Sequence, residues 1–300
     1  MGRLETIMTE YDLVVIGSGI AGMTSAIYLK RAGLKTLIIE NNAPGGVLQK
    51  GYDIENYPGY PQINSVDLAD NIYTSVNNLN VEYIFESIKE IDLENKNIIT
   101  TNHNIKTKYI IIATGRSEKR LNIDNEEKLI GNGISFCANC DGYFFKDKDV
   151  IVVGGSNTAV TYAIYLSNIC KKVTIIYRND NLRAEKILLN RLEDKNNVNI
   201  IYNANIKKYN IENDSLKSVT LDNGEIVLAS GVFLAIGWIP NSELFDVEKD
   251  NGYIMVDKNY HTSIDKVYAI GDVIKKDVYQ LTTATSDATI AAINIINDIK

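Results

Sequence analysis

A glycine-rich turn near the amino end places the strongest constraint on how this chain can fold. Residues 11–16 form a short β-rich run, GSGIAG follows at 17–22, and a helical pattern then extends to Gly33. A second β-rich run, residues 35–40, ends in the acid Glu40. A strand, GxGxxG, a helix and a second strand with a terminal acid predict a βαβ unit that binds a dinucleotide.

The residues of this turn each have a physical role. Gly17 permits the tight turn, Gly19 lets the backbone approach a pyrophosphate, and Gly22 lets the helix pack close to the strand. Glu40 can accept hydrogen bonds from a ribose and would repel a 2′-phosphate. This pattern alone does not distinguish FAD from NAD.

Three further turns favour FAD. One follows Glu40 closely, and the other two each end a β-rich run. They resemble repeated elements of flavoproteins with two dinucleotide sites, in which a Gly-Asp aspartate binds the FAD ribityl chain. The expected FAD-binding residues are therefore Gly17, Gly19, Gly22, Glu40, Gly45, Gly46, Ala113, Thr114, Gly115, Gly271 and Asp272.

A second βαβ unit lies in the middle of the chain. Its strands are residues 148–153 and 173–177, and its turn is GGSNTA at 154–159. The turn reads GxSxxA, with Ser156 where the backbone should pass closest to a pyrophosphate. A Cβ atom restricts positive φ, so we expect nucleotide binding to be weakened here.

The order of these segments predicts an α/β fold with two Rossmann-like dinucleotide-binding-type domains, the second inserted into the first. We place a discontinuous FAD-binding domain at residues 1–119 and 246–300. The inserted pyridine-nucleotide-type domain is expected at 120–245.

A CxxC pair lies between the two glycine-rich turns. Cys137 and Cys140 are followed directly by Asp141. Two thiols at this spacing can close as a disulfide and reopen as a dithiol, and a nearby acid can move the proton that controls the chemistry. A zinc site would need two more ligands, and the remaining cysteine and the two histidines lack ligand spacing. The pair therefore predicts a redox function, with Cys170 inert.

Composition limits the partners and the compartment. A net charge of -7 argues against broad nucleic-acid binding and against affinity for anionic membranes. No apolar run reaches membrane-spanning length, and the first ten residues lack the apolar core of a secretory signal. Together with few cysteines, these features lead us to expect a cytoplasmic protein.

The motifs resemble, in order and spacing, those of the low-molecular-weight thioredoxin reductases, from about residue 10 to the end of the chain. The resemblance rests on GSGIAG at 17–22, ENYPG at 55–59, ATG at 113–115, CANCDG at 137–142, AIGWIPN at 235–241 and AIGD at 269–272. It implies a homodimer in which electrons pass from NADPH through FAD and the CxxC disulfide to thioredoxin. It also implies a large rotation of the inserted domain.

The resemblance further implies individual roles. Cys140 is the thiol that meets the flavin, Cys137 attacks the thioredoxin disulfide, and Asp141 is the general acid/base. The FAD-binding set then also includes Asn56, Gln280 and Leu281.

Departures from the family pattern gather on the NADPH motifs. The close-approach glycine, a Glu-Glu pair, and the histidine and central arginine of HRRxxxR are all replaced, as is the arginine of a later RQA. Two arginines of HRRxxxR are present, Arg178 and Arg183. We therefore expect NADPH use to be lost. The replaced positions are Ser156, Thr161, Tyr162, Tyr177, Asn179 and Tyr279.

These departures resemble family members that take electrons from reduced ferredoxin. The leading hypothesis is a flavin-dependent thioredoxin-disulfide reductase with ferredoxin as donor, docked on basic residues that include Lys171, Lys172, Arg178, Arg183 and Lys186. The alternatives are a conventional NADPH-dependent enzyme, a flavin dithiol oxidase, and a flavin-binding sensor or scaffold without turnover.

Overall fold

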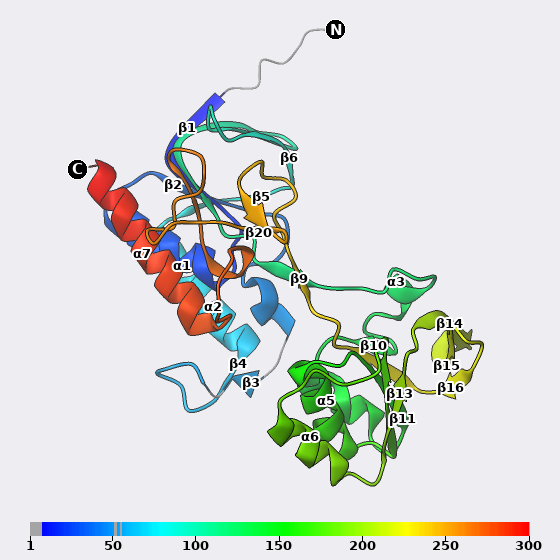
Figure 1. Cartoon of the computed structure of the whole chain (residues 1–300). Helices are drawn as coiled ribbons and strands as arrows, with labels where there is room; N and C mark the ends of the chain where they lie inside the picture. Colours follow the sequence, from blue (N-terminus) through cyan, green and yellow to red (C-terminus); the bar gives the residue numbers. More distant parts are fainter. Residues whose placement is uncertain (1–7, 51–52, 55, 300) are drawn as a thin grey trace, which may run out of the picture. The chain divides into compact units, whose positions relative to one another are not determined.

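The computed structural model describes residues 8–50, 53–54 and 56–299 (Figure 1). The chain forms two compact units, of which the first combines residues 1–117 with 239–300. Residues 118–238 form the second, which we call the inserted unit.

The first unit is built on a mostly parallel sheet with strand order β5-β2-β1-β8-β7-β6, and β21 also pairs with β8. Its central strand β1 carries consecutive apolar residues with no exposed surface, Leu13, Val14 and Val15, because both faces of the sheet are covered. The strands are β1 (Met8–Ile16), β2 (Thr36–Glu40), β5 (Glu82–Phe85), β6 (Ile88–Asp92), β7 (Asn97–Thr100), β8 (Asn104–Ile112) and β21 (Val267–Ala269).

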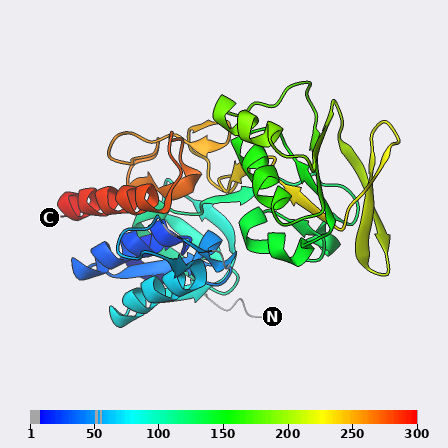
Figure 2. The same ribbon diagram turned by 90° about the horizontal axis from the view of Figure 1, so that it is seen from below.

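Three helices pack together in the first unit. Helix α1 (Ile20–Arg31) lies between α2 (Ser65–Asn78) and α7 (Leu281–Ile299), as Figures 1 and 2 show. The buried face of α7 is largely alanine, which lets the neighbouring helix approach closely. The helical alternation of apolar residues over 286–299 falls within this helix, which begins at Leu281.

The inserted unit has a parallel sheet of its own, in the order β10-β17-β11-β12-β13, with helices α5 and α6 and a three-stranded antiparallel sheet. This confirms the predicted α/β class. The elements are β10 (Ile134–Ser135), β11 (Asp149–Val153), α5 (Asn157–Ser167), β12 (Lys172–Tyr177), α6 (Lys186–Glu193), β13 (Val198–Tyr202), β14 (Ile206–Glu212), β15 (Ser215–Leu221), β16 (Ile226–Leu228) and β17 (Gly231–Leu234).

The two crossings between the units pair with each other. Strand β9 (Arg116–Glu118) pairs with β18 (Trp238–Pro240). The first unit resumes at Ile239, whereas the sequence analysis expects the return at residue 246. Phe245 explains the difference, because it is 1% exposed and packs into the core of the first unit.

Short elements complete the described residues. None of the described helices combines the length and the apolar character needed to cross a membrane. The short elements are β3 (Asp53–Ile54), β4 (Ile63–Asn64), α3 (Glu126–Leu129), α4 (Ala138–Asp141), β19 (Lys249–Asp250), β20 (Tyr253–Ile254) and the 3-10 turns Gly46–Lys50, Gly142–Phe145 and Gly271–Val273.

Candidate functional site

Three of the predicted FAD-binding turns meet at one edge of the first sheet. Strands β1, β8 and β21 are parallel neighbours, with Ile16 and Ala269 both in register with Ile112. The turns that begin at Gly17, Ala113 and Gly271 therefore leave the sheet side by side, at the carboxyl ends of the strands, where open α/β sheets bind ligands.

The first glycine turn has the shape of an anion cradle. A Cβ atom on Gly22 would lie 2.0 Å from the carbonyl oxygen of Gly17, so α1 can pack here only with glycine. At Gly19 the described residues leave open space, with no atom within 4 Å of an added Cβ. The N-terminus of α1 has no side-chain cap and no acid in its first turn, so its free N–H groups can receive a phosphate.

Glu40 is held at the end of β2 by four hydrogen bonds. Its Oε2 accepts from the backbone N–H and the hydroxyl of Ser18, at 2.8 and 2.9 Å. Its Oε1 accepts from the backbone N–H groups of Asn41 and Asn42, at 2.8 and 2.9 Å. The carboxylate is thus fixed beside the glycine turn, and a ribose hydroxyl would have to replace one of these donors.

Further FAD-binding candidates of the first unit contact the glycine turn or one another. The Gly45 N–H donates to the Ser18 carbonyl at 2.8 Å, which lays the Gly45-Gly46 turn against Gly19. Asn56 Nδ2 donates to Gln280 Oε1 at 3.4 Å, directly before α7 begins. The uncapped helix, the open space and the converging turns fit a bound dinucleotide.

Asp272 lies between two cations that are not among the expected FAD-binding residues. Its Oδ2 is 3.1 Å from Arg116 Nε and its Oδ1 is 3.6 Å from Lys276 Nζ. Arg116 immediately follows the ATG turn, and no local sequence pattern links it to a residue so far along the chain.

The CxxC segment forms a short helix, α4, on the inserted unit. Cys137 is disulfide-bonded, and its carbonyl oxygen accepts from the N–H of Asp141 at 3.2 Å. The side chain of Cys140 lies outside the described part of the structure. Ser135 Oγ accepts from the N–H of Cys137 at 3.0 Å, which fixes the entry to the helix. Asp141 is half-buried beside the pair.

Cys170 is a free, buried thiol. Burial raises its pKa to about 11, so the thiolate is scarce at neutral pH. This fits the inert role expected for it. It lies after the end of α5 at Ser167 rather than inside the helix.

Two exposed aromatic side chains directly follow the CxxC helix. Tyr143 is 71% exposed and Phe144 is 74% exposed. Large apolar side chains so exposed next to a reactive centre suggest a contact surface for a partner. They are not among the residues expected from the sequence, although the run YFF after the glycine at 142 is a visible signal.

The second glycine turn differs from the expectation in one respect. Ser156 has φ −90°, an extended conformation open to any residue, so its Cβ causes no backbone strain. A Cβ on Gly155 would instead lie 2.5 Å from the ring of Tyr177. The Tyr177 hydroxyl accepts from Asn179 Nδ2 at 2.9 Å, so the residue in place of the central arginine is turned toward the tyrosine.

The second turn still has the features of an anion site. The N–H of Arg183 donates to the carbonyl of Gly155 at 2.6 Å, the counterpart of the Gly45 contact with Ser18 in the first unit. Arg178 and Arg183 are exposed. Helix α5 has no side-chain cap and no acid in its first turn. A phosphate could therefore be bound here by the helix terminus and two guanidinium groups.

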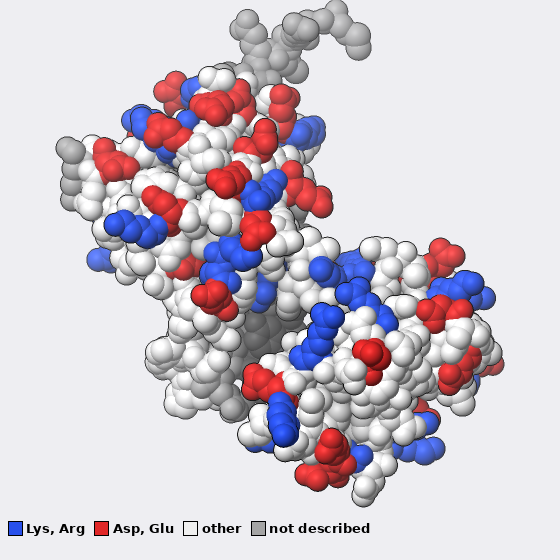
Figure 3. All heavy atoms as spheres, in the orientation of Figure 1, with Lys and Arg blue, Asp and Glu red and all other residues white. Residues whose placement is uncertain are grey.

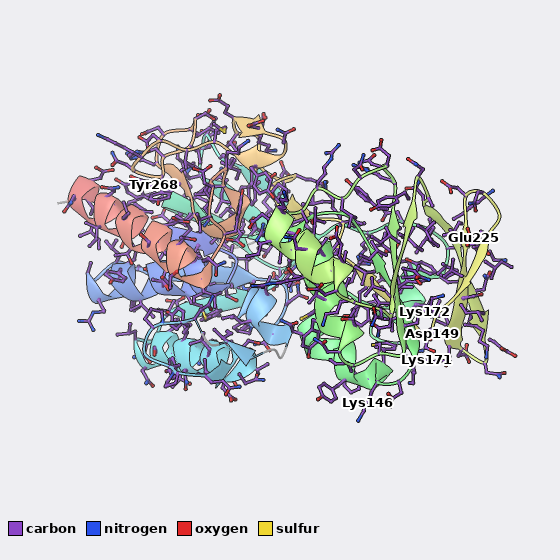
Figure 4. All side chains as sticks on the ribbon, turned by 60° about the horizontal axis from the view of Figure 1, so that its bottom comes forward. Lys146, Asp149, Lys171, Lys172, Glu225 and Tyr268 are labelled. Carbon is purple, nitrogen blue, oxygen red and sulfur yellow. The ribbon has the colours of Figure 1, made fainter. Side chains whose placement is uncertain are left out.

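The basic residues expected to form one docking surface are split. Lys171 and Lys172 lie at the amino end of β12, near Lys146 and beside Asp149, the first residue of β11 (Figure 4). Arg178 follows the carboxyl end of β12, six residues along an extended strand from Lys172, or roughly 20 Å. The two groups therefore lie at opposite ends of the sheet.

Comparison with known proteins gives the class and then the family. A family model described as pyridine nucleotide-disulphide oxidoreductase matches residues 11–288, which is the class that two glycine turns and a disulfide-bonded cysteine define. The chain belongs to the thioredoxin reductase family. It is 38% identical over 293 residues to the thioredoxin reductase of Bacillus subtilis (strain 168), covering 94% of this chain and 92% of the relative. Its fold matches Lactococcus lactis thioredoxin reductase with a TM-score of 0.79 and 35% identity, covering 96% and 99% of the two chains.

The expected resemblance to ferredoxin-dependent enzymes is not supported. A ferredoxin-flavin thioredoxin reductase from Clostridium acetobutylicum is 24% identical, with a TM-score of 0.55, and covers 98% of this chain and 99% of its own. At that identity the likeness shows the fold alone. The chain is thus a flavin-dependent thioredoxin reductase, and its relatives favour the conventional alternative over a ferredoxin donor.

Proposed function

We propose that this chain reduces the disulfide of thioredoxin with electrons that pass from FAD through Cys137 and Cys140. The first unit holds FAD, and the inserted unit carries the redox pair. The observation that carries the proposal is the disulfide-bonded Cys137, which directly precedes α4, with the exposed Tyr143 and Phe144 in the turn that follows this helix. Family membership supports it independently.

The proposed chemistry is thiol–disulfide exchange. FAD, when bound, supplies a carrier that accepts two electrons and passes them to the CxxC disulfide. The Cys137 thiolate attacks the thioredoxin disulfide, which forms a mixed disulfide and releases one thioredoxin thiolate. Cys140 then attacks Cys137, which restores the CxxC disulfide and releases the second thiolate. The two substrate thiolates each gain a proton, and the role proposed for Asp141 is to exchange protons with the cysteine pair.

We infer that Tyr143 and Phe144 contact thioredoxin. They are the most exposed aromatic side chains among the described residues, and they follow the redox helix without a break. Burying them against a partner would remove apolar surface from water and place the partner disulfide near Cys137.

We propose NADPH as the electron donor. The uncapped N-terminus of α5 and the exposed Arg178 and Arg183 support a phosphate site. The extended backbone at Ser156 removes the strain argument against it. The loss of the central arginine at Asn179 predicts weaker binding but leaves the site in place.

Reduced ferredoxin is the second candidate donor. Two features of the second glycine turn favour it. The Tyr177 ring packs on Gly155, and Asn179 is turned toward that ring, so both residues differ from the NADPH-binding pattern of the family. Figure 3 draws one face of the inserted unit, on which several basic side chains lie close together with acidic ones around them. The split of the lysines from the arginines weakens this candidate.

Anaerobic stopped-flow absorbance tests the proposal. The oxidised protein, yellow with about one FAD per chain, is mixed with NADPH, NADH or reduced ferredoxin while flavin bleaching is followed. We expect NADPH to bleach the flavin and thioredoxin to reoxidise the protein. Bleaching by ferredoxin alone, slowed by salt, would instead establish the second candidate. A colourless protein that cannot be reconstituted with FAD would refute the function.

We also propose a homodimer, as the family resemblance implies. Sedimentation velocity of the FAD-loaded protein measures it directly, and a concentration-independent monomer would contradict it.

A further inference from the structure

Four charged side chains form a cluster behind the Gly271-Asp272 turn of the first unit. Arg116 Nε lies 3.1 Å from Asp272 Oδ2, and their side chains are 17% and 24% exposed. Lys276 Nζ lies 3.6 Å from Asp272 Oδ1 and 2.8 Å from Asp287 Oδ2. Partly buried ion pairs are less screened by solvent than surface pairs, so these cations offset the negative charge of Asp272 more strongly.

Lys276 forms its shorter ion pair with Asp287. The Asp287 side chain is 7% exposed and its Oδ1 accepts from the hydroxyl of Tyr260 at 2.8 Å. Its Oδ2 accepts from the N–H of Gly271 at 3.2 Å as well as from Lys276. This buried carboxylate needs the lysine as its cation, which leaves Arg116 as the cation that balances Asp272.

Tyr279 holds the guanidinium of Arg116 in place. The Cζ atom of Arg116 lies 4.2 Å from the centroid of the Tyr279 ring, a distance typical of cation–π contact. The family resemblance places an arginine at position 279, where this chain has tyrosine. Arg116, the first residue of β9, thus brings a guanidinium close to the position where the family has its arginine. The change at 279 is matched by a local contact and needs no loss of NADPH use to explain it.

We propose that Arg116 is a positioning residue of the FAD site: it fixes the Asp272 carboxylate, offsets its charge, and so raises the reduction potential of the bound flavin. This rests on the proposed function, in which Asp272 binds the ribityl chain. Reduction adds negative charge to the flavin. An unbalanced Asp272 nearby would oppose that charge, and Arg116 removes the opposition.

The test compares potentials and affinities of FAD-loaded proteins. Arg116→Met removes the charge and keeps an apolar stem of similar length. We expect its flavin midpoint potential, measured by equilibration with a reference dye, to be more negative than that of the unmodified protein. We expect its FAD dissociation constant to rise about tenfold. Arg120→Met is the matched control, since Arg120 pairs with Glu127 in the inserted unit, and it should change neither quantity.

Two further variants keep the proposal falsifiable. Arg116→Met combined with Asp272→Asn removes both charges, so its potential should return toward the unmodified value. Arg116→Lys keeps a cation and should shift the potential little, which decides the matter if Arg116→Met does not retain FAD. An unchanged potential in FAD-loaded Arg116→Met, or a large negative shift in Arg116→Lys, would overturn the proposal. Both results leave the reductase function intact, whereas a colourless unmodified protein refutes the function itself.

Discussion

The hydroxyl of Tyr162 donates a hydrogen bond to the carbonyl oxygen of Phe136 at 2.9 Å. Phe136 directly precedes the redox cysteine Cys137, so helix α5 is tied to the CxxC segment. Burial raises the pKa of Tyr162, which therefore remains a donor at physiological pH. The family resemblance places a glutamate of the NADPH site at this position. In this chain the residue at that position, Tyr162, instead holds the residue before the CxxC pair by a hydrogen bond.

Tyr162→Phe should loosen the CxxC segment. Loss of one buried neutral hydrogen bond leaves the Phe136 carbonyl without this donor, and we expect the inserted unit to lose about 1 kcal/mol of stability. Turnover with thioredoxin should fall several-fold, while flavin reduction by the donor stays unchanged. Chemical unfolding and steady-state assays measure these effects. Tyr202→Phe is the control, because Tyr202 lies on β13 of the same unit and is 39% exposed. Equal effects of both substitutions would show that the contact has no special role.

Substitution of the three cysteines should affect turnover differently. Cys137→Ser and Cys140→Ser are each expected to abolish thioredoxin reduction and to leave FAD content normal, because exchange requires both sulfurs. Cys170→Ser should leave turnover near normal, because burial holds the pKa of that thiol at about 11. Titration with a thiol reagent at pH 8 should find Cys170 slow to react. Near-normal turnover in either CxxC variant would refute the assignment.

The exposed aromatic pair should affect thioredoxin binding and not flavin reduction. Alanine in place of both Tyr143 and Phe144 is expected to raise the KM for thioredoxin about tenfold or more, since exposed aromatic anchors often carry 2 kcal/mol or more of binding energy. The rate of flavin reduction by the donor should not change. A matched control replaces Ile226 and Leu228, which are 63% and 64% exposed on β16 of the same unit. If the control raises KM equally, the effect is not specific to the redox helix.

The acid side of the stability profile depends on Glu86. Its carboxylate accepts from the hydroxyl of Thr100 at 2.6 Å and from the N–H of Asn102 at 2.9 Å, and these bonds lower its pKa to about 2. A carboxyl with a lowered folded-state pKa contributes stability above its ordinary pKa and loses it as the pH falls toward the folded value. We therefore expect the first unit to weaken between about pH 4.5 and 2. Glu86→Gln should be less stable at pH 7 and show a flatter profile in urea unfolding across that window.

Local patterns predict the framework of this protein well. The two βαβ units, their glycine turns and the CxxC pair are short-range features, and each occupies its expected place. The contacts that surround these motifs join residues that lie far apart in the sequence. Arg116 meets Asp272 because β8 and β21 are neighbours in the sheet, and nothing in either segment indicates this. The split of Lys172 from Arg178 likewise follows from a strand that runs between them, although the two residues are close in sequence.

The nucleotide side of the inserted unit gives the sharpest remaining test, because a gain of function can be expected there. Asn179→Arg restores a guanidinium beside Arg178 and Arg183. A charge-assisted contact with a phosphate contributes about 1.5–3 kcal/mol, so the variant should bind NADPH about 10–100-fold more tightly. NADH binding should not improve, since it lacks the 2′-phosphate. Ser156→Gly should change affinity little, because the backbone there is already unstrained at φ −90°. The dependence of the flavin bleaching rate on NADPH concentration measures each affinity. If Asn179→Arg gains nothing and Ser156→Gly restores binding, steric closure of the turn, rather than a missing charge, controls the donor.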